Sequence, residues 1–439
     1  NEVKSLEPGH VLHIGPEGEP DIARFWFPKF NVRHDISDAQ WIEETRDQLM
    51  GTVKRHMLAD VTVGAFLSGG VDSSAVVAAM ARHATAPVKA FTMGFPGTSL
   101  DETQAAARIA EHFGCEHIVM PLEPQDAGLM LPQVQAAHDE PCAATAAVPV
   151  WYLSKLAAQH VKVVLCGEGS DEIFAGYKRQ RTALAAARAA PLMHMLEPLA
   201  AALDRMPGLN SRRWNYLRQN ARRFRMSAAM ENNFQRFFQG TQISTPWVRE
   251  ELYSQEFHSR QESETPFADL EQEYFGWPGA RELDPLDQFM LADLTVHMPA
   301  SLLNRTDRGS MAHSLEARVP FLSHKFVDWA LTMPKHMKLH GKVGKYALRE
   351  AVQPWLFPGA LDKRKLGFQL PFAEWFSGDF NRFALEIWKS SGASKSGYLR
   401  EDAVDRLFAE HAASYANHGR ILYAIAMFAC WWDQNIDAS

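Results

Sequence analysis

The sequence predicts an α/β protein with a doubly wound parallel sheet, followed by a large, mostly helical C-terminal part. Strand-like and helix-like patterns alternate from about residue 37 to residue 180. The strand-like runs are almost continuously apolar, as in parallel strands that helices cover on both faces. Beyond Tyr177 nearly all of the patterns are helical. We therefore expect a linker region in residues 1–36, the α/β core in residues 37–180 and the helical part in residues 181–439.

The elements of the core are expected in a regular order. Apolar spacing predicts a helix over residues 39–56, and the β-branched run VTVGAFL predicts a strand over residues 61–67. A helix over residues 73–83 follows. The later elements are a strand at 88–95, a helix at 101–113, strands at 116–122 and 161–166, and two helical stretches between these last two strands.

Composition excludes several functions. The formal net charge of -7 provides no global positive field, so nucleic acid is not an expected partner. The four cysteines are scattered and form no CxxC pair, which favours a reducing cytoplasm over a disulfide scaffold or a zinc site. No apolar run approaches the ~20 residues of a membrane-spanning helix, so no membrane association is expected. The oligomeric state stays open, a homodimer included.

The stretch AFLSGGVDSSAVV places two glycines between a strand and a helix. Such a turn lets backbone amides point inward, and a helix N-terminus favours anions. The spacing differs from the usual nucleoside-triphosphate loop, and no lysine follows the glycines. Asp72 would repel phosphates unless a divalent cation lies between them, which indicates magnesium pyrophosphate and adenylyl transfer. The alternative is a plain glycine turn in which Ser73 only caps the helix.

A second glycine turn follows another buried-type strand, in VVLCGEGSDEIFAGYKR. Its acids should reach the same edge of the sheet as Asp72. Asp171 could share the metal with Asp72, and Glu168, on the turn itself, is placed to act as a general base. Glu172 is better explained as an acid that the dipole at the helix N-terminus stabilises.

Five ordered blocks carry a resemblance that covers about residues 1–390. They are AFLSGGVDSS, VVLCGEGSDEIFAGY, LLNRTDRGSMAHSLEARVPFLSHKFVDWAL, GKVGKYALRE and RKLGFQLPFAEW. Together they resemble the synthetase part of the glutamine-hydrolysing asparagine synthetase family and its amide-ligase relatives. The resemblance implies a core of the adenine nucleotide alpha hydrolase (PP-loop) type. It also implies that ATP adenylates a carboxylate and that ammonia attacks the acyl-adenylate, which gives an amide, AMP and pyrophosphate.

The resemblance also implies roles for individual residues. Ser68, Gly69, Gly70, Asp72, Ser73 and Ser74 would grip pyrophosphate, and Asp72 and Asp171 would hold Mg²⁺. Backbone near Leu67, Met93, Gly94 and Gly167 would hold adenine. Glu168 would be the base, and Lys345 would neutralise charge on the leaving phosphates. By spacing alone, Lys342 and Lys345 could instead line a solvated helix face.

Four charged residues could form a buried ion-pair network that braces the helices rather than contact a ligand: Asp307, Arg308, Glu316 and Arg318. Arg308 is the candidate among them for a contact with ATP. Three positions depart from the family pattern: Cys166 and Ser323 replace a serine and an aspartate, and Arg305 replaces a common lysine. Cys166 is expected to be an inert core thiol.

The glutaminase domain of the family is the expected missing partner. Glutamine-using members begin with a catalytic cysteine, whereas residue 1 here is Asn1 and the first cysteine is Cys115. Residues 1–36 resemble the closing strands of that domain and its linker. We therefore expect a synthetase part that uses free ammonia, with the glutaminase domain in the same or a separate chain.

The substrate stays open at this stage. Aspartate is the first expectation, but relatives amidate sugar acids or close β-lactam and peptide rings. A tRNA-thiolating or NAD-forming ligase, or a non-catalytic nucleotide-binding protein on the same fold, are the rivals of another class. The basic stretch at 210–225 is better explained by a solvated helix or a domain contact than by RNA binding. The segment at 139–152 is expected to form a wall of the substrate pocket.

Overall fold

The fold is built around a five-stranded parallel sheet. The computed structural model describes residues 4–205, 212–263, 266–362, 370–376, 378–413 and 415–437. The strand order is β5-β4-β3-β6-β7. The strands are β3 (Val63–Phe66), β4 (Lys89–Gly94), β5 (Glu116–Pro121), β6 (Val163–Leu165) and β7 (Glu316–Arg318). All four neighbouring pairs are parallel, which confirms the predicted fold class.

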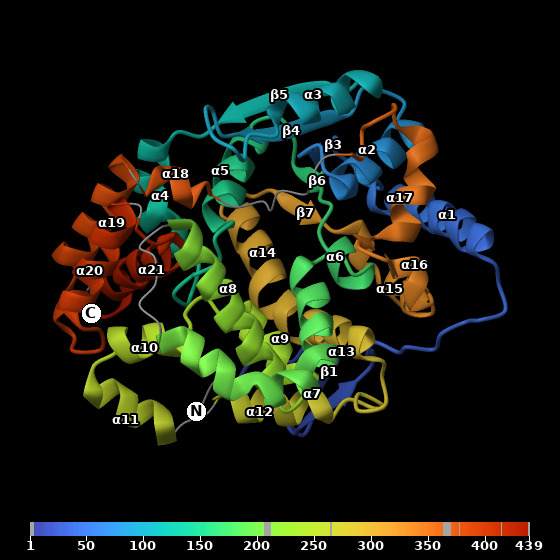
Figure 1. The fold of residues 1–439 in the computed structure, drawn as a ribbon. Coiled ribbons are helices and arrows are strands. Elements are labelled where there is room, and N and C mark those ends of the chain that lie inside the picture. Colours follow the sequence, from blue (N-terminus) through green and yellow to red (C-terminus); the bar gives the residue numbers. More distant parts are fainter. Residues whose placement is uncertain are drawn as a thin grey trace.

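Helices cover both faces of this sheet (Figure 1). Successive residues of a strand point to opposite faces, and Val164 and Leu165 accordingly belong to two different hydrophobic cores. One core includes α4 (Pro124–Ala136), α5 (Ala147–Ala157), α19 (Asp379–Ser390) and α21 (Gly419–Asn435). The other includes α1 (Asp38–His56), α2 (Val71–His83), α3 (Thr103–His112), α15 (His324–Leu331) and α17 (Tyr346–Val352). This coverage explains the continuous apolar strands.

The strand order places a topological switch point between β3 and β6. The chain runs from β3 outward to β4 and β5, and then returns to the other side of β3 as β6. In open α/β sheets, ligands bind at such a point, beyond the carboxyl ends of the strands. The register pairs Ala65 with Leu165, so the two strands end at the same level. This confirms the prediction that the two glycine turns lie side by side at the same edge of the sheet.

Several elements were not predicted from the sequence, among them the short hairpin of β8 (Leu339–His340) and β9 (Val343–Gly344). Strand β7 joins the sheet from beyond residue 180, and a π-helix, η1 (Asp293–Leu303), runs directly into α14 (Asn304–Met311). The predicted boundaries of the other core elements differ from the observed ones by at most two residues, the usual scatter at element ends. The division of the chain at residue 180 stays a prediction.

The other elements are mostly helices, and those from α7 to α13 lie together below the sheet in the view of Figure 1. They are α6 (Ser170–Ile173), α7 (Lys178–Arg205), α8 (Arg212–Ala229), α9 (Asn233–Thr241), α10 (Pro246–Leu252), α11 (Gln255–Ser263), α12 (Pro266–Phe275), α13 (Pro285–Ala292), η2 (Pro320–Leu322), α16 (Lys335–Lys338), η3 (Gln353–Trp355), α18 (Phe372–Trp375), η4 (Gly392–Lys395) and α20 (Glu401–Ala412). Two short hairpins, β1 (His10–Ile14) with β2 (Pro20–Arg24) and β8 (Leu339–His340) with β9 (Val343–Gly344), complete the fold.

Two stretches singled out in the sequence extend beyond the described residues. Of the block RKLGFQLPFAEW, residues 364–369 lie outside them, as do residues 210 and 211 of the basic stretch. Within the described part of the chain, no helix combines the length and the apolar character needed to cross a membrane.

Candidate active site

The turn after β3 is tied into a tight loop by Ser73. Its Oγ accepts a hydrogen bond from the Ser68 N–H at 3.1 Å and donates to the Gly70 carbonyl at 3.3 Å. Helix α2 begins at Val71 with Gly70 as its N-cap residue and no side-chain cap. The alternative in which Ser73 serves as the cap is therefore wrong. Gly69 has φ +74°, and a Cβ there would lie 2.8 Å from the backbone nitrogen of Ala106, so only glycine fits.

This loop leaves the start of α2 available to an anion. The helix has 13 residues and begins directly at the sheet edge, where its first N–H groups and its dipole favour negative charge. Ser74 lies in the first turn, and its buried Oγ has no hydrogen-bond partner within the described residues. A loop of this geometry can accept phosphate oxygens, and we refer to it as the cradle.

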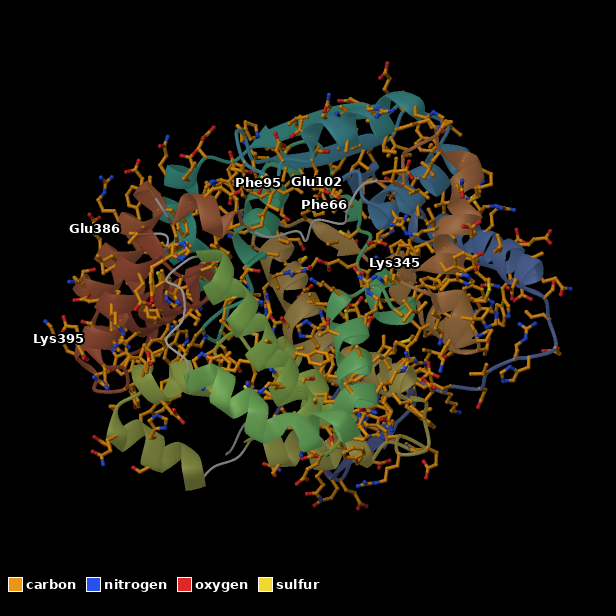
Figure 2. All side chains as sticks on the ribbon, in the orientation of Figure 1. Phe66, Phe95, Glu102, Lys345, Glu386 and Lys395 are labelled. Atoms are coloured by element: carbon orange, nitrogen blue, oxygen red, sulfur yellow. The ribbon has the colours of Figure 1, made fainter. Side chains whose placement is uncertain are left out.

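Lys345 lies between two carboxylates at the end of this cradle. Its Nζ is 2.5 Å from each carboxylate oxygen of Asp72 and 2.8 Å from Oδ1 of Asp171. Figure 2 shows Lys345 inside the molecule, and its exposed fraction is only 2%. Burial alone would lower the pKa of Lys345, but the charges of Asp171 and Asp72 raise it above its ordinary value. Lys342, by contrast, is exposed.

The backbone around Lys345 is arranged to allow this contact. Lys345 has φ 58°, a left-handed conformation that costs about 1–2 kcal/mol for a residue with a Cβ. Its N–H donates to the Phe174 carbonyl at 2.8 Å. A Cβ at Gly176 would lie 2.0 Å from Asp171 Oδ1 and 2.2 Å from Lys345 Cε. Glycine at this position therefore lets the lysine and the aspartate meet, and such local strain is typical of functional sites.

The turn after β6 presents Glu168 beside these groups. Its carboxylate accepts a hydrogen bond from Arg305 Nη2 at 2.5 Å and another from Thr306 Oγ1 at 2.7 Å. A carboxylate has about four lone-pair sites, so two donors leave capacity for a third. The preceding Cys166 is buried, and burial raises the pKa of its thiol well above the ordinary value, which fits an inert core cysteine.

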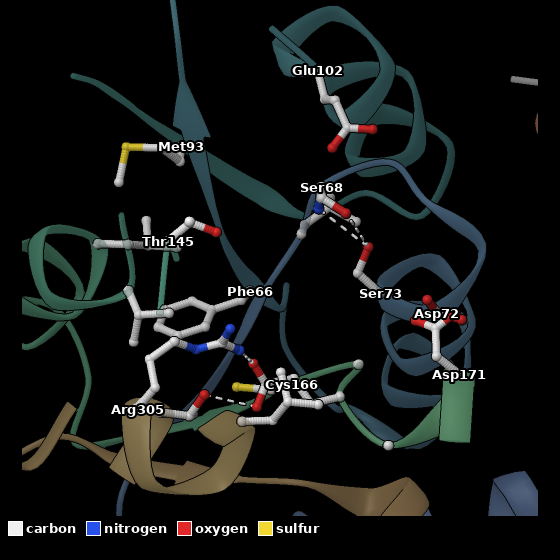
Figure 3. Close-up of a pocket in the computed structure, with 18 of the residues that line it drawn as sticks. Phe66, Ser68, Asp72, Ser73, Met93, Glu102, Thr145, Cys166, Asp171 and Arg305 are labelled. Atoms are coloured by element: carbon white, nitrogen blue, oxygen red, sulfur yellow. Dashed lines mark hydrogen bonds and ion pairs between the residues drawn. The ribbon is translucent and has the colours of Figure 1, made fainter. Parts of the chain in front are cut away.

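A cavity of about 380 Å³ connects these groups. Figure 3 shows Ser68, Ser73, Asp72 and Asp171 on one side and Phe66, Met93 and Thr145 on another. The apolar side is completed by Phe91, Phe95, Leu100, Val150 and Leu153. Such a surface suits a planar ring, and it lies where the resemblance expects adenine.

The backbone of Leu67 is less available than expected. Its N–H donates to the Phe91 carbonyl at 2.9 Å, and its carbonyl accepts from Thr92 Oγ1 at 2.7 Å. Only the second lone pair of this carbonyl remains for a ligand.

Sequence reasoning missed a polar cluster at the other end of the cavity. Buried Glu172 accepts a hydrogen bond from the Tyr177 hydroxyl at 2.5 Å, and Arg179 pairs with the buried Asp293. Burial, followed by the charges of Asp171 and Asp293, raises the pKa of Glu172 to about 8. Glu172 lies in the first turn of α6, as predicted, but its side chain is also buried and lines the cavity, which the sequence did not indicate. No sequence pattern indicated this cluster, because its residues come from three separate elements.

His297 of the π-helix lines the same end of the cavity. Burial, and then the charges of Arg179, Arg305 and Arg420, lower its pKa from 6.5 to about 3. The folded state therefore keeps this imidazole neutral where the unfolded state would protonate it. The associated stability is complete above about pH 6.5 and is lost as the pH falls toward 3.

Replacing His297 by Gln is expected to make the protein less sensitive to acid. At about pH 5 the wild type should lose about 2 kcal/mol of unfolding free energy through this group, and the variant should not. Urea unfolding at about pH 5 and pH 7.5 measures the difference. His13→Gln, on the exposed strand β1, is the matched control, and a pH dependence that is the same in all three proteins would contradict the assignment.

The structure brings most of the predicted site residues to one cavity. Its lining includes Leu67, Ser68, Asp72, Ser73, Met93, Gly167, Glu168 and Asp171. Gly69 and Gly70 belong to the cradle loop behind it, Ser74 lies in the first turn of α2, and Gly94 ends β4. Arg308 is not part of this lining; it forms an ion pair with Asp139 at 2.6 Å, and both side chains are largely exposed. The roles of all these residues stay predictions.

The expected ion-pair network around Arg308 is not observed. Arg318 pairs with Glu316 at 2.7 Å, and it also donates to the carbonyls of His56 and Leu58. The pair of Arg308 with Asp139 is separate from this one, and the acid of each pair is more than half exposed. These are two isolated contacts, because β7 carries Glu316 and Arg318 to the sheet while Arg308 stays on α14.

The fold and the site together define an α/β protein with an anion cradle and a set of acids at the switch point of its sheet. The model of a known family, described as asparagine synthase, matches residues 44–433. The chain belongs to the asparagine synthase family.

Individual relatives agree with this assignment. The chain is 29% identical over 436 residues to asparagine synthetase (glutamine-hydrolyzing) 1 of Bacillus subtilis, with 99% of this chain and 66% of the relative covered. It is 32% identical over 438 residues to a "Putative asparagine synthetase (glutamine-hydrolyzing)" of Mycobacterium tuberculosis, with 98% and 64% covered. It is 24% identical over 463 residues to amidase chry2 of Gibberella zeae, with 92% and 64% covered. The chain thus spans about two thirds of the length of these curated relatives.

Proposed function

We propose that this chain is the synthetase part of an ATP-dependent ligase that converts a carboxylic acid into an amide, with release of AMP and pyrophosphate. The observation that carries the proposal is the convergence of Lys345, Asp72 and Asp171 at an anion cradle, with Glu168 on the neighbouring strand tip. The cradle would hold the β- and γ-phosphates, and the apolar side of the cavity would receive adenine. The α-phosphorus would then face the polar end, where the acid binds.

Asp72 and Asp171 fit a magnesium ion. They are two carboxylates already arranged about a cation, the ammonium of Lys345. In the part of the chain that the structure describes, no group of three or more His, Cys, Asp or Glu side chains could hold a metal, so phosphate oxygens would complete the ligand set. Bound there, Mg²⁺ would neutralise charge on the departing pyrophosphate. Lys345 would provide a second positive charge at the same point.

Glu168 would take a proton from ammonium, so that neutral ammonia attacks the acyl-adenylate. Arg305 and Thr306 hold its carboxylate at the polar end of the cavity, and a free lone pair remains for the incoming nucleophile. Arg305, treated in the sequence only as a departure from the family pattern, is thus a positioning residue for the base.

The source of ammonia and the cellular location belong to the same proposal. Glutamine, through a glutaminase domain in the same or a separate chain, would supply ammonia, as the names of the relatives indicate for those proteins. All four cysteines are free, which supports a cytoplasmic location.

A screen of carboxylic acids tests the proposal. The purified chain, given ATP, magnesium and ammonium, should release AMP at least about tenfold faster with a true substrate than without any acid, because adenylation needs an acceptor carboxylate. Aspartate is the first acid to test, followed by sugar acids and amino-acid precursors of cyclic products. Chromatography separates AMP from ADP. Formation of ADP, or AMP release that no acid accelerates, would contradict the proposed reaction.

A further inference from the structure

A second cavity, of about 560 Å³, lies beside the candidate active site. It is enclosed by helices α7, α8 and α9, by Phe289 of α13 and by the start of α21. Five of its lining residues are cationic: Lys178, Arg179, Arg223, Arg236 and Arg420. The described lining contains no aspartate or glutamate. We refer to this space as the arginine cavity.

The arginine cavity adjoins the polar end of the active-site cavity. Arg179 lines both of them. The charges of Arg179, Arg305 and Arg420 all act on the pKa of His297, which itself lines the active-site cavity. Arg305, Arg179 and Arg420 thus form a series of positive side chains that runs from the partner of Glu168 to the far wall of the arginine cavity. Arg305 and Arg179 each pair with a carboxylate. The distal end of an acid bound at the reacting centre would lie near these positive charges.

Most of this positive charge is not neutralised by the described protein. Arg179 has a carboxylate partner, the buried Asp293. Arg236 is only 8% exposed, yet its guanidinium donates to the neutral oxygens of Asn233 and Met230, and its Nε is buried without a partner within the described residues. Such an arrangement is costly unless an anion completes it.

The two arginines of the far wall, Arg223 and Arg420, have no carboxylate partner among the described residues either. The ion pairs found between described residues include neither Arg223 nor Arg420. Burial, and then the repulsion from Arg223 and Arg179, lower the pKa of Arg420. Arg420 and Arg223 are nevertheless both exposed, and both line the cavity. A guanidinium in this position can bind a phosphate or carboxylate with two parallel hydrogen bonds.

We propose that the arginine cavity binds an anionic group at the distal end of the acid that the enzyme amidates. The inference rests on the proposed function and narrows its substrate class: a carboxylic acid longer than aspartate, with a second anionic group beyond its reacting carboxylate. The walls formed by Phe237 and Phe289 would pack against the carbon skeleton between the two groups. The chemistry fits a distal phosphate or a distal carboxylate.

Three six-carbon acids that differ at the distal end test this inference: gluconate, glucarate and 6-phosphogluconate. The wild-type chain should release AMP with a kcat/KM about tenfold or more higher for an acid with a distal anion than for gluconate. Glucarate and 6-phosphogluconate distinguish a carboxylate from a phosphate. Arg420→Ala should remove this preference, mainly by raising KM for the anionic acid. Arg222→Ala is the matched control, because Arg222 lies on the same helix as Arg223 but stacks on Trp247 and does not line the cavity.

Calorimetry of 6-phosphogluconate and glucarate binding without ATP separates the inference from the proposed reaction. If no acid supports AMP release, but an anionic acid binds to the wild type and to Arg222→Ala and not to Arg420→Ala, the proposed reaction fails and the anion site stands. Equal use of the three acids by the wild type would overturn the inference. So would an unchanged preference in Arg420→Ala, or the absence of both binding and turnover.

Discussion

Asp72→Asn is expected to lower the exchange of pyrophosphate into ATP by about a thousandfold. The substitution keeps the shape of the side chain but removes one of the two carboxylates that Lys345 holds at 2.5 and 2.8 Å. Loss of a cation ligand and of charge balance at the leaving pyrophosphate should cost about 4 kcal/mol of transition-state stabilisation. Radioactive pyrophosphate, supplied with an acid that supports AMP release, measures this half-reaction directly.

The control for this experiment is Asp60→Asn. Asp60 is an exposed acid ahead of β3, outside the active-site cavity. The Asp60→Asn variant should exchange pyrophosphate into ATP at the wild-type rate, and both variants should unfold at similar urea concentrations. Exchange in Asp72→Asn within about threefold of the wild-type rate would show that this carboxylate does not hold the phosphates or their cation.

Glu168→Gln is expected to separate the two halves of the reaction. Glutamine can still accept a hydrogen bond from Arg305 and donate one to Thr306, so the fold of the turn should persist. Pyrophosphate exchange should stay within about threefold of the wild-type rate, while amide formation from ammonium should fall by about 10²–10⁴-fold, the usual contribution of a general base. Amide product and AMP are measured in the same samples.

Hydroxylamine provides the decisive comparison for Glu168. It is uncharged at neutral pH and attacks an acyl-adenylate without prior loss of a proton. The variant should therefore form hydroxamate at nearly the wild-type rate while its amide formation fails. Parallel loss of exchange, amide and hydroxamate would mean that Glu168 maintains the structure of the turn and does not move a proton.

The core of the fold could be predicted because its signals are local. Apolar runs such as VTVGAFL and VKVVLC are followed at once by glycine turns, and each such run forms a strand of the observed sheet. Strand β7 gave no such signal, because its three residues, Glu316–Arg318, are Glu-Ala-Arg and contain no apolar alternation. The π-helix was equally hidden, since its hydrogen bonds depend on the packing around it and not on a sequence pattern.

The residue pattern alone indicated the site only on the two turns, and the resemblance added Lys345 and Met93. Asp72, Ser73 and Glu168 stand within a few residues of a recognisable strand end. Arg305 is 137 residues from Glu168, and Arg420 is a further 115 residues along the chain, so only the tertiary structure brings them to the same field. Lys345 was expected to face phosphates, but the sequence did not reveal that it also neutralises both acids.

The late arrival of β7 has a consequence for how the molecule is made. The end of β6 at Leu165 and Glu316 are separated by 150 residues, so one edge of the central sheet is completed only by a contact of very long sequence separation. During synthesis, β6 would remain an unpaired edge, with open backbone groups, until this segment emerges from the ribosome. Contacts of this kind slow folding, because a long loop must close before the pairing is gained. The central sheet, with the candidate active site at its edge, would therefore reach its final structure late, after most of the helices have formed.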